Sequence, residues 1–221
     1  MRTLLGGAMA IALLLAPGAG ADTDWDAVME EWEPDEDGFI HLFNGEDLEG
    51  WHIQGSSEGF SVEDGVIRSV GGLGGDWMYW DVAEFSDFEL VVEWRVSEDG
   101  NSGVFIRVPP EGQPWVTGYE VQIVCETHHR EDHHCTGSLY DYVAVDPRPD
   151  ETPEVWREFV IRAEGDHIQV FWEGEQIIDY DQSTQERTQD KPLSGFIGVQ
   201  DSHAAEGTWV EFRTIKARPL S

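Results

Sequence analysis

The sequence predicts an all-β fold, a jelly-roll β-sandwich built from two antiparallel sheets. Three observations lead to this prediction. Turn-forming Gly, Asp and Asn residues recur about every 8–12 positions after Phe39, and the short runs between them are rich in Val, Ile and aromatic residues. No long helical period follows Phe39. Roughly 200 residues of such strands suit a jelly roll better than a smaller immunoglobulin domain.

The best-defined strands alternate between apolar and polar residues. In the run from 88 to 97, Phe88 and Leu90 share one face, whereas Glu89 and Glu93 share the other. One apolar and one mixed face per strand predicts two sheets packed face to face. Further strands are expected at residues 103–108, 118–125, 158–163, 167–172, 176–180, 196–200 and 208–217.

The N-terminus has the pattern of a secretory signal peptide at residues 1–21. Arg2 supplies a positive charge, Leu4 to Leu15 form an apolar run, and Ala21 ends an Ala-x-Ala motif. The apolar run is shorter than the ~20 residues that a membrane helix needs. No cysteine near the motif indicates a lipid anchor, and no second apolar run predicts a membrane span. We therefore expect a secreted or periplasmic protein.

The rest of the chain divides into an acidic leader and one domain. Residues 22–38 are acidic, with Trp25 and Trp32 in a weak helical rhythm, and they predict a short helix or a tether. Residues 39–221 are expected to form the β-sandwich domain, and no internal repeat or low-complexity tract divides it further.

The charge balance is strongly acidic. The chain carries 45 acidic and 13 basic residues, for a formal net charge of −32, and only two of the basic residues are lysines, Lys191 and Lys216. Such a surface repels nucleic acid and anionic lipid, so neither is expected as a partner. Dense carboxylate with few lysines favours a halophilic source, because concentrated counter-ions screen the self-repulsion. An acidic protein that is indifferent to salt is the alternative.

Two cysteines, Cys125 and Cys135, lie close together in the sequence. In an exported protein a disulfide between them is the expected state, and by the chain-entropy argument it would stabilise the fold by about 2–3 kcal/mol. Two free thiols or a metal pair are the alternatives. The His-rich run from His128 to Cys135 lacks the fixed ligand spacing of a zinc site, so we interpret it as a solvated polar loop.

Polar residues on well-formed strands mark the candidate site. Glu120 and Gln122 lie two positions apart on one strand face, so their side chains are about 6–7 Å apart along it. Arg107 is expected on the same strand face as Phe105. If the strands are neighbours, one sheet face gathers a guanidinium, carboxylates, amides and an imidazole. The remaining candidates lie in a turn, at a strand end and in the loop after it: Asn101, Gln200, Asp201 and His203.

This mixture of side chains suits a sugar, whose hydroxyls need paired donors and acceptors and whose ring face stacks on aromatic residues. The alternative interpretations are structural. A Glu-x-Gln pair can be a solvated strand face, a lone Arg can pair with any carboxylate, and tryptophans are more often core residues. The sequence contains no serine-hydrolase elbow and no phosphate-binding glycine loop. The aromatic residues available for stacking are Trp51, Trp77, Tyr79, Trp80, Trp115, Tyr140 and Trp156.

Several segments of the chain match one protein family. The strongest matches are the runs Asn-Ser-Gly-Val-Phe-Ile-Arg at 101–107 and Gly-Tyr-Glu-Val-Gln-Ile at 118–123, and weaker ones lie at 39–51, 62–67, 85–90, 136–140 and 195–201. From Phe39 to Arg218 the chain thereby resembles the 3-keto-disaccharide hydrolase family. The resemblance implies a concanavalin-like jelly roll that acts on glycosides oxidised to a ketone at sugar carbon 3. The resemblance also implies that five residues form the family's polar cluster: Asn101, Arg107, Glu120, Gln122 and Gln200.

The chain departs from this family at three places, one of which is the His-rich run from His128 to Cys135, an apparent insertion. Cys125 stands where relatives often carry Asp. The Gln-Asp-His-Gly run of relatives is opened here to Gln-Asp-Ser-His at 200–203.

The implied ketone suggests a mechanism. A carbonyl at carbon 3 acidifies the hydrogen on carbon 2, so a modest base can remove it and the enolate can expel the group at carbon 1. We expect Glu120 or His203 as the base. The developing oxyanion would lie among Arg107, Asn101 and Gln122. A divalent metal held by Glu120, Asp201 or His203 is an alternative electrophile. The residues expected to bind the sugar are Asn101, Gln122, Gln200, Asp201, Tyr140 and Trp156.

Three other functions are compatible with the same sandwich. Ordinary glycoside hydrolysis needs two carboxylates, and no second acid shares a strand face with Glu120. A non-catalytic carbohydrate-binding or adhesion module would use the same aromatic and amide residues but no essential base. A structural exported domain with protein partners would need neither the sugar-binding residues nor the base.

We predict that the protein loses fold stability as ionic strength falls, because the repulsion among its carboxylates is then less screened. Thermal unfolding followed from molar to millimolar sodium chloride measures this directly. A midpoint that stays constant over that range would contradict the halophilic interpretation.

Overall fold

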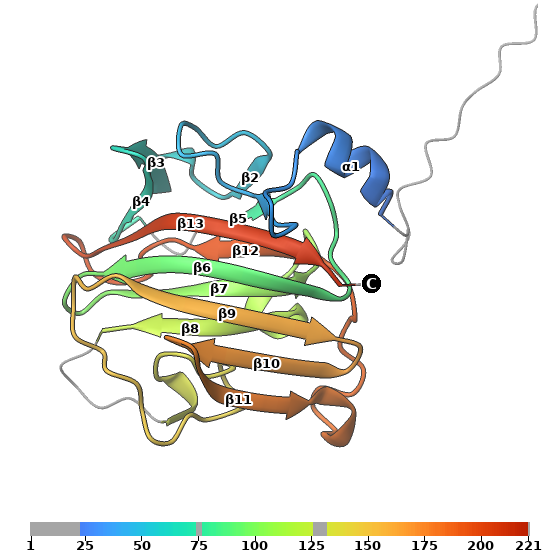
Figure 1. Ribbon diagram of the computed structural model, residues 1–221. Helices are drawn as coiled ribbons and strands as arrows, with labels where there is room; N and C mark the ends of the chain where they lie inside the picture. Colours follow the sequence, from blue (N-terminus) through green and yellow to red (C-terminus); the bar gives the residue numbers. More distant parts are fainter. Residues whose placement is uncertain (1–22, 74–76, 126–131, 221) are drawn as a thin grey trace, which may run out of the picture.

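The computed structural model describes residues 23–73, 77–125 and 132–220, so the predicted signal peptide and part of the His-rich loop lie outside the described residues. Two antiparallel sheets make up the fold (Figure 1). The larger sheet has the order β11-β10-β9-β6-β13-β4-β3, with β1 paired to β13, and the smaller sheet has the order β2-β5-β12-β7-β8.

The strands of the larger sheet are β1 (Ile40–His41), β3 (Phe60–Glu63), β4 (Val66–Val70), β6 (Phe88–Val96), β9 (Arg157–Glu164), β10 (His167–Trp172), β11 (Glu175–Asp181) and β13 (Trp209–Pro219). Those of the smaller sheet are β2 (Trp51–Gln54), β5 (Trp77–Trp80), β7 (Asn101–Val108), β8 (Tyr119–Val124) and β12 (Phe196–Gln200). Short helices are α1 (Trp25–Glu31) and α2 (Pro114–Thr117), with 3-10 turns at Ser57–Gly59, Asp132–His134 and Gln182–Thr184.

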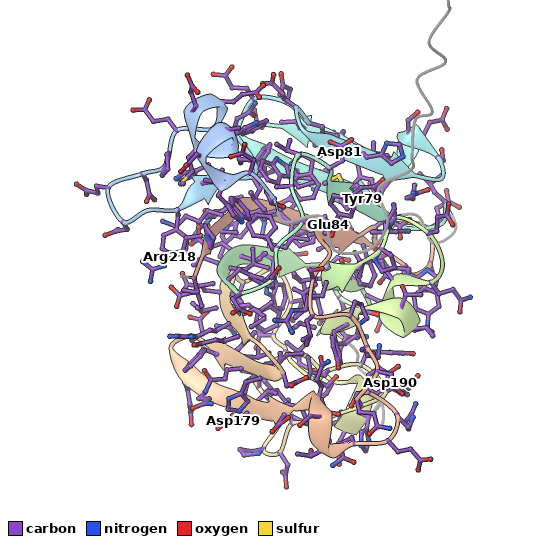
Figure 2. All side chains as sticks on the ribbon, turned by 90° about the vertical axis from the view of Figure 1, so that its right-hand side faces the viewer. Tyr79, Asp81, Glu84, Asp179, Asp190 and Arg218 are labelled. Carbon is purple, nitrogen blue, oxygen red and sulfur yellow. The ribbon has the colours of Figure 1, made fainter. Side chains whose placement is uncertain are left out.

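The alternating strands bury one face each between the sheets, which confirms the predicted jelly-roll sandwich. Along β6 every second residue, from Phe88 to Val96, is buried. Strand β8 contributes three side chains to the same core: Tyr119, Val121 and Ile123. Burying each large apolar side chain stabilises the fold by about 1.5–3 kcal/mol. Side chains fill the space between the sheets, and the labelled carboxylates Asp179 and Asp190 lie at the periphery (Figure 2).

The acidic leader is packed against the domain by helix α1. Asp24 caps the helix by accepting a hydrogen bond from the amide of Ala27 at 3.3 Å. The Trp25 ring lies 4.8 Å from that of Phe85, and the Trp32 ring lies edge-on at 5.2 Å from that of Trp80. The two tryptophans therefore anchor the short helix that the sequence suggested. None of the helices in the described ranges is long and apolar enough to cross a membrane.

The sequence predicted that Arg107 shares the strand face of Phe105, but in the structure it does not. The pairing of β7 with β12 shifts register here, and Arg107 has a φ of 52°. A bulge of this kind redirects one side chain. The fully buried guanidinium donates to the carbonyl oxygens of Ser86 at 2.8 Å and Gly165 at 2.7 Å, and lies 3.5 Å from the Asp87 carboxylate. Arg107 thus joins loops at one end of the sandwich.

The predicted disulfide is wrong for this structure. Cys125 and Cys135 are both free thiols, and both are buried within the hydrophobic core. The Cys135 sulfur instead donates to the carbonyl oxygen of Asp132 at 3.1 Å. Burial raises the pKa of each thiol, so neither has the thiolate character of a reactive cysteine.

We predict that Arg107→Met destabilises the protein by about 3–5 kcal/mol, because the Ser86 and Gly165 carbonyls lose their buried donor. Chemical denaturation measures the change. The matched control is Arg162→Met, since Arg162 pairs with Glu164 on the surface and its loss should cost no more than about 1 kcal/mol. Equal effects of the two substitutions would contradict the structural role of Arg107.

Candidate functional site

A polar hollow lies on the outer face of the smaller sheet. Three of its strands contribute polar side chains that alternate with core residues: Asn101 from β7, Glu120 and Gln122 from β8, and Gln200 from β12. Because β8 pairs with β7, which pairs with β12, these side chains converge. The hollow is small, with a cavity volume of about 120 Å³, below the range of drug-sized ligand pockets. Its lining consists of Asn101, Trp115, Glu120, Gln122, Tyr140, Gln200 and His203.

Glu120 is seated against a glycine on the neighbouring strand. Gly103 pairs with Gln122, and a Cβ atom added to Gly103 would lie 2.3 Å from Oε1 of Glu120 and 2.6 Å from its Cγ. The carboxylate therefore occupies the space that any other residue at position 103 would fill. Glu120 is only 4% exposed, which removes it from bulk water while the hollow keeps it accessible to a ligand.

The amides surround this carboxylate with donors and acceptors. With its amide nitrogen turned toward its acceptors, Gln122 donates to Oε1 of Glu120 at 2.9 Å and to the carbonyl oxygen of Ser102 at 3.1 Å. The Gln122 and Asn101 amides lie 3.0 Å apart. Oε1 of Gln200 is buried and has no hydrogen-bond partner within the described part of the chain. A buried acceptor of this kind favours a ligand hydroxyl as its donor.

Aromatic side chains form two walls of the hollow. The backbone amide of Tyr140 donates to the carbonyl oxygen of Glu120 at 3.0 Å, which holds this wall beside the carboxylate. The Tyr140 ring stacks on His134, with 4.4 Å between centroids and 25° between planes, and His134 lies 2.6 Å from Asp141. Trp115, on helix α2, forms the second wall.

Most of the other aromatic candidates are packing residues. Trp77 and Tyr79, both 7% exposed, form a second apolar cluster with Phe105 and Val108 under partly buried Trp115 and Phe196. Trp80 belongs to the main core. Only Trp115 and Tyr140 among the candidates line the hollow. Pro114 begins helix α2 and directly precedes Trp115. Because proline is favoured at the first position of a helix, it was the signal in the sequence that could have indicated a helix carrying this wall.

His203 lies at the rim. Its backbone amide donates to the carbonyl oxygens of Asn101 at 2.7 Å and Asp201 at 2.9 Å, and the side-chain amide of Asn101 lies 3.4 Å from the His203 carbonyl oxygen. These bonds fix the backbone of the loop after β12, whereas the His203 side chain remains exposed. The imidazole is therefore placed to meet the solvent-facing end of a bound ligand.

Three predicted site residues lie elsewhere. Arg107 is held at one end of the sandwich, as described above. Trp156 lies against the larger sheet, with the guanidinium groups of Arg95 and Arg213 at 4.8 and 4.6 Å from its ring centroid. Asp201 is fully buried and does not line the hollow. The expectation that these three residues join Glu120 at the sugar site is therefore corrected.

A metal centre does not fit the residues present. Among the described residues, no three His, Cys, Asp or Glu side chains are grouped so that they could hold a metal ion. Of the expected ligands, Glu120 lines the hollow, His203 reaches it from the rim and Asp201 is buried outside it. We therefore derive no chemical step through a metal.

The fold is a jelly roll that solved structures of other proteins share. A solved carbohydrate binding module from Bacillus subtilis has the same fold, with a TM-score of 0.51 at 13% identity over 76% of this chain and 95% of its own. A protein from Parabacteroides distasonis, provisionally named a glycosyl hydrolase, superposes with a TM-score of 0.72 at 22% identity, over 91% of this chain and 99% of its own.

Sequence comparison identifies the family. The chain belongs to the family of 3-keto-alpha-glucoside-1,2-lyase-like domains, whose family model matches residues 38–218. A curated 3-keto-disaccharide hydrolase from Bacteroides thetaiotaomicron is 26% identical over 235 aligned positions, which cover 84% of this chain and 80% of the relative. The resemblance inferred from the sequence motifs is thereby confirmed, and the chain is a carbohydrate hydrolase-like protein.

We predict that Gly103→Ala destabilises the protein by about 1–3 kcal/mol, because the new methyl group overpacks against Glu120. In a Glu120→Ala background the same substitution should cost almost nothing, since the space is then free. Chemical denaturation of the four proteins in this double-mutant cycle gives the coupling free energy. Additive effects would contradict the seating of Glu120 on Gly103.

Proposed function

We propose that the protein is an exported enzyme that cleaves 3-keto-glycosides, such as 3-keto-disaccharides, by base-assisted elimination or hydrolysis. The observation that carries the proposal is the buried Glu120 carboxylate, held between amides on the floor of a hollow with aromatic walls. Family membership and the printed name of the curated relative support the substrate class. The signal-peptide pattern at residues 1–21 supports export.

In the proposed reaction, Glu120 removes the proton on carbon 2 of the keto sugar. The electron pair of the broken C–H bond delocalises onto the ketone oxygen at carbon 3, forming an enolate. The enolate then re-forms the ketone, a double bond forms between carbons 1 and 2, and the bond from carbon 1 to the glycosidic oxygen breaks. Water can add to that double bond afterwards, which makes the overall reaction a hydrolysis.

The amides are suited to the enolate. Gln122 uses both of its N–H groups on Glu120 and Ser102, so Asn101 and Gln200 are the amides that can donate to the enolate oxygen. Neutral donors aimed at a developing oxyanion are a general source of transition-state stabilisation. Gln122 touches both Glu120 and Asn101, so it can position the base and the donor together. Without Arg107 in the hollow, the amides replace the guanidinium that the sequence had suggested.

The leaving group requires a proton. His203, exposed at the rim, is the side chain placed to supply it to the departing oxygen, and it is also the alternative base. Of the residues that line the described hollow, Glu120 alone is a carboxylate, so ordinary two-carboxylate hydrolysis has less support.

A non-catalytic sugar-binding module is the second candidate function. It is favoured by the shared fold of the carbohydrate binding module from Bacillus subtilis. Such a module would bind the sugar through the same walls and amides, but it would not need Glu120 as a base.

We predict that Glu120→Gln lowers cleavage of a 3-keto-disaccharide by about 10²–10⁴-fold, the range contributed by a positioned general base. The assay is run in high salt with the oxidised sugar and its unoxidised parent, with and without chelator, and products are followed by mass spectrometry. The matched control is Glu158→Gln on the larger sheet, which should retain full activity.

Full activity of Glu120→Gln would contradict the role of Glu120 as base. Saturable binding of the sugar by folded wild-type protein, without any product, would favour the binding module instead. Loss of activity with chelator would contradict the metal-free route.

A further inference from the structure

Residues 182–191, which we call the bracing segment, follow β11 and form the coil at the lower right of Figure 1. Asp190, labelled in Figure 2, belongs to this segment. The hydroxyl of Thr188 donates to the carbonyl oxygen of Gln182 at 3.0 Å and lies 2.5 Å from the Tyr180 hydroxyl. Gln182 and Thr188 are each 1% exposed. The segment is therefore fixed on the body of the domain.

Lys191 connects the bracing segment to the Trp115 wall. Its ammonium group donates to the carbonyl oxygen of Val116 at 2.8 Å and to that of Gly118. These are terminal carbonyls of helix α2, which carries Trp115. A helix of four residues has little stability alone, and a cation at its C-terminus both satisfies carbonyls and complements the helix dipole. Lys191 therefore stabilises the helix that holds Trp115.

The same ammonium group is also enclosed by two tyrosines. Its nitrogen lies 4.5 Å from the ring centroid of Tyr119 and 4.3 Å from that of Tyr142, within the range of cation–π attraction. Tyr119 immediately precedes Glu120 on β8, and its hydroxyl donates to Gln182 at 3.0 Å. The bracing segment thus touches the strand that carries the proposed base.

Arg187 connects the bracing segment to the Tyr140 wall. It donates to the carbonyl oxygen of Asp141 at 3.1 Å, and its guanidinium lies 4.9 Å from the Tyr142 centroid. Asp141 is the residue after Tyr140, whose ring lines the hollow. Tyr142 therefore contacts both cations of the bracing segment, Arg187 and Lys191.

We propose that the bracing segment sets the separation of the Trp115 and Tyr140 walls, with Lys191 and Arg187 as positioning residues for a single sugar ring. The proposal rests on the proposed function of the hollow as a keto-sugar site. Neither residue lines the hollow, so each acts through the wall to which it is bonded. The chain has only two lysines, and one of them, Lys191, makes these contacts instead of neutralising carboxylates on the acidic surface.

The test compares Lys191→Met with Lys216→Met. Lys216 is a matched control, because it also lies over an aromatic ring, 4.6 Å from the Phe39 centroid, and bonds an oxygen atom, that of Asp35, at 3.1 Å. Both substitutions remove one lysine from the chain and leave the hollow's lining unchanged. A comparison of Arg187→Lys with Arg187→Gln then tests whether a side chain that keeps the positive charge preserves the bracing of the Tyr140 wall.

Hydrogen exchange in the ligand-free proteins measures the bracing without reference to function. We predict that amides of residues 115–118 and 139–143 exchange about tenfold faster in Lys191→Met, but not in Lys216→Met. The affinity for a 3-keto-disaccharide, measured by calorimetry, should fall about tenfold in Lys191→Met alone. Unchanged exchange in Lys191→Met would overturn the proposal. Faster exchange in a protein whose wild type binds no keto sugar would support the bracing and contradict the proposed function.

The pH dependence gives a second test of Lys191. Burial, and to a smaller extent the charge of Arg187, lowers the pKa of Lys191 to about 8. Burial raises the pKa of both facing tyrosines, Tyr119 and Tyr142, so they stay neutral near pH 8. The guanidinium of Arg187 also faces Tyr142. The wild-type affinity should therefore fall as pH rises through about 8, with no such step in Lys191→Met. An identical fall in both proteins would overturn the role assigned to the Lys191 charge.

Discussion

The contact between the Glu120 carboxylate and the bare backbone of Gly103 is the constraint on which the rest of the site depends. Pairing of β7 with β8 brings position 103 beside Gln122, and the missing side chain at 103 leaves the space in which the carboxylate lies. Gln122 then touches Glu120 on one side and Asn101 on the other, so the amides take their positions from the same strand register. A shift of one residue in that register would turn the whole polar set into the core.

The cations of this acidic chain are concentrated in structural contacts. The guanidinium of Arg107 is fully buried among loop carbonyls, and the Glu211 carboxylate pairs with both Arg68 and Arg95. Lys191 lies between carbonyls and tyrosine rings. With 13 basic residues against 45 acidic ones, each such use removes positive charge from the surface, which stays strongly acidic.

The fold and the centre of the site could be predicted from the sequence, because both follow from the two-residue period of strands. That period correctly placed Glu120 and Gln122 on one face and Tyr119 on the other. It failed at Arg107, where a bulge breaks the alternation, and nothing in the pattern around residue 107 marks an αL backbone. Trp156, Asp201 and the two cysteines were misplaced because their environments depend on long-range packing, which local periodicity does not encode.

The inventory of the hollow fits a ketone better than an ordinary glycoside. Direct glycoside cleavage develops positive charge on the sugar ring, and it needs an acid and a second carboxylate at a set distance. A 3-keto sugar develops negative charge on one oxygen instead, for which neutral amide donors are sufficient, and its acidified carbon 2 needs only one modest base. The described hollow offers one buried carboxylate, three amides and one imidazole at the rim. Such a site would be poorly equipped for an oxocarbenium ion, whereas the proposed elimination would use the carboxylate as base, the amides around the enolate and the imidazole at the leaving group.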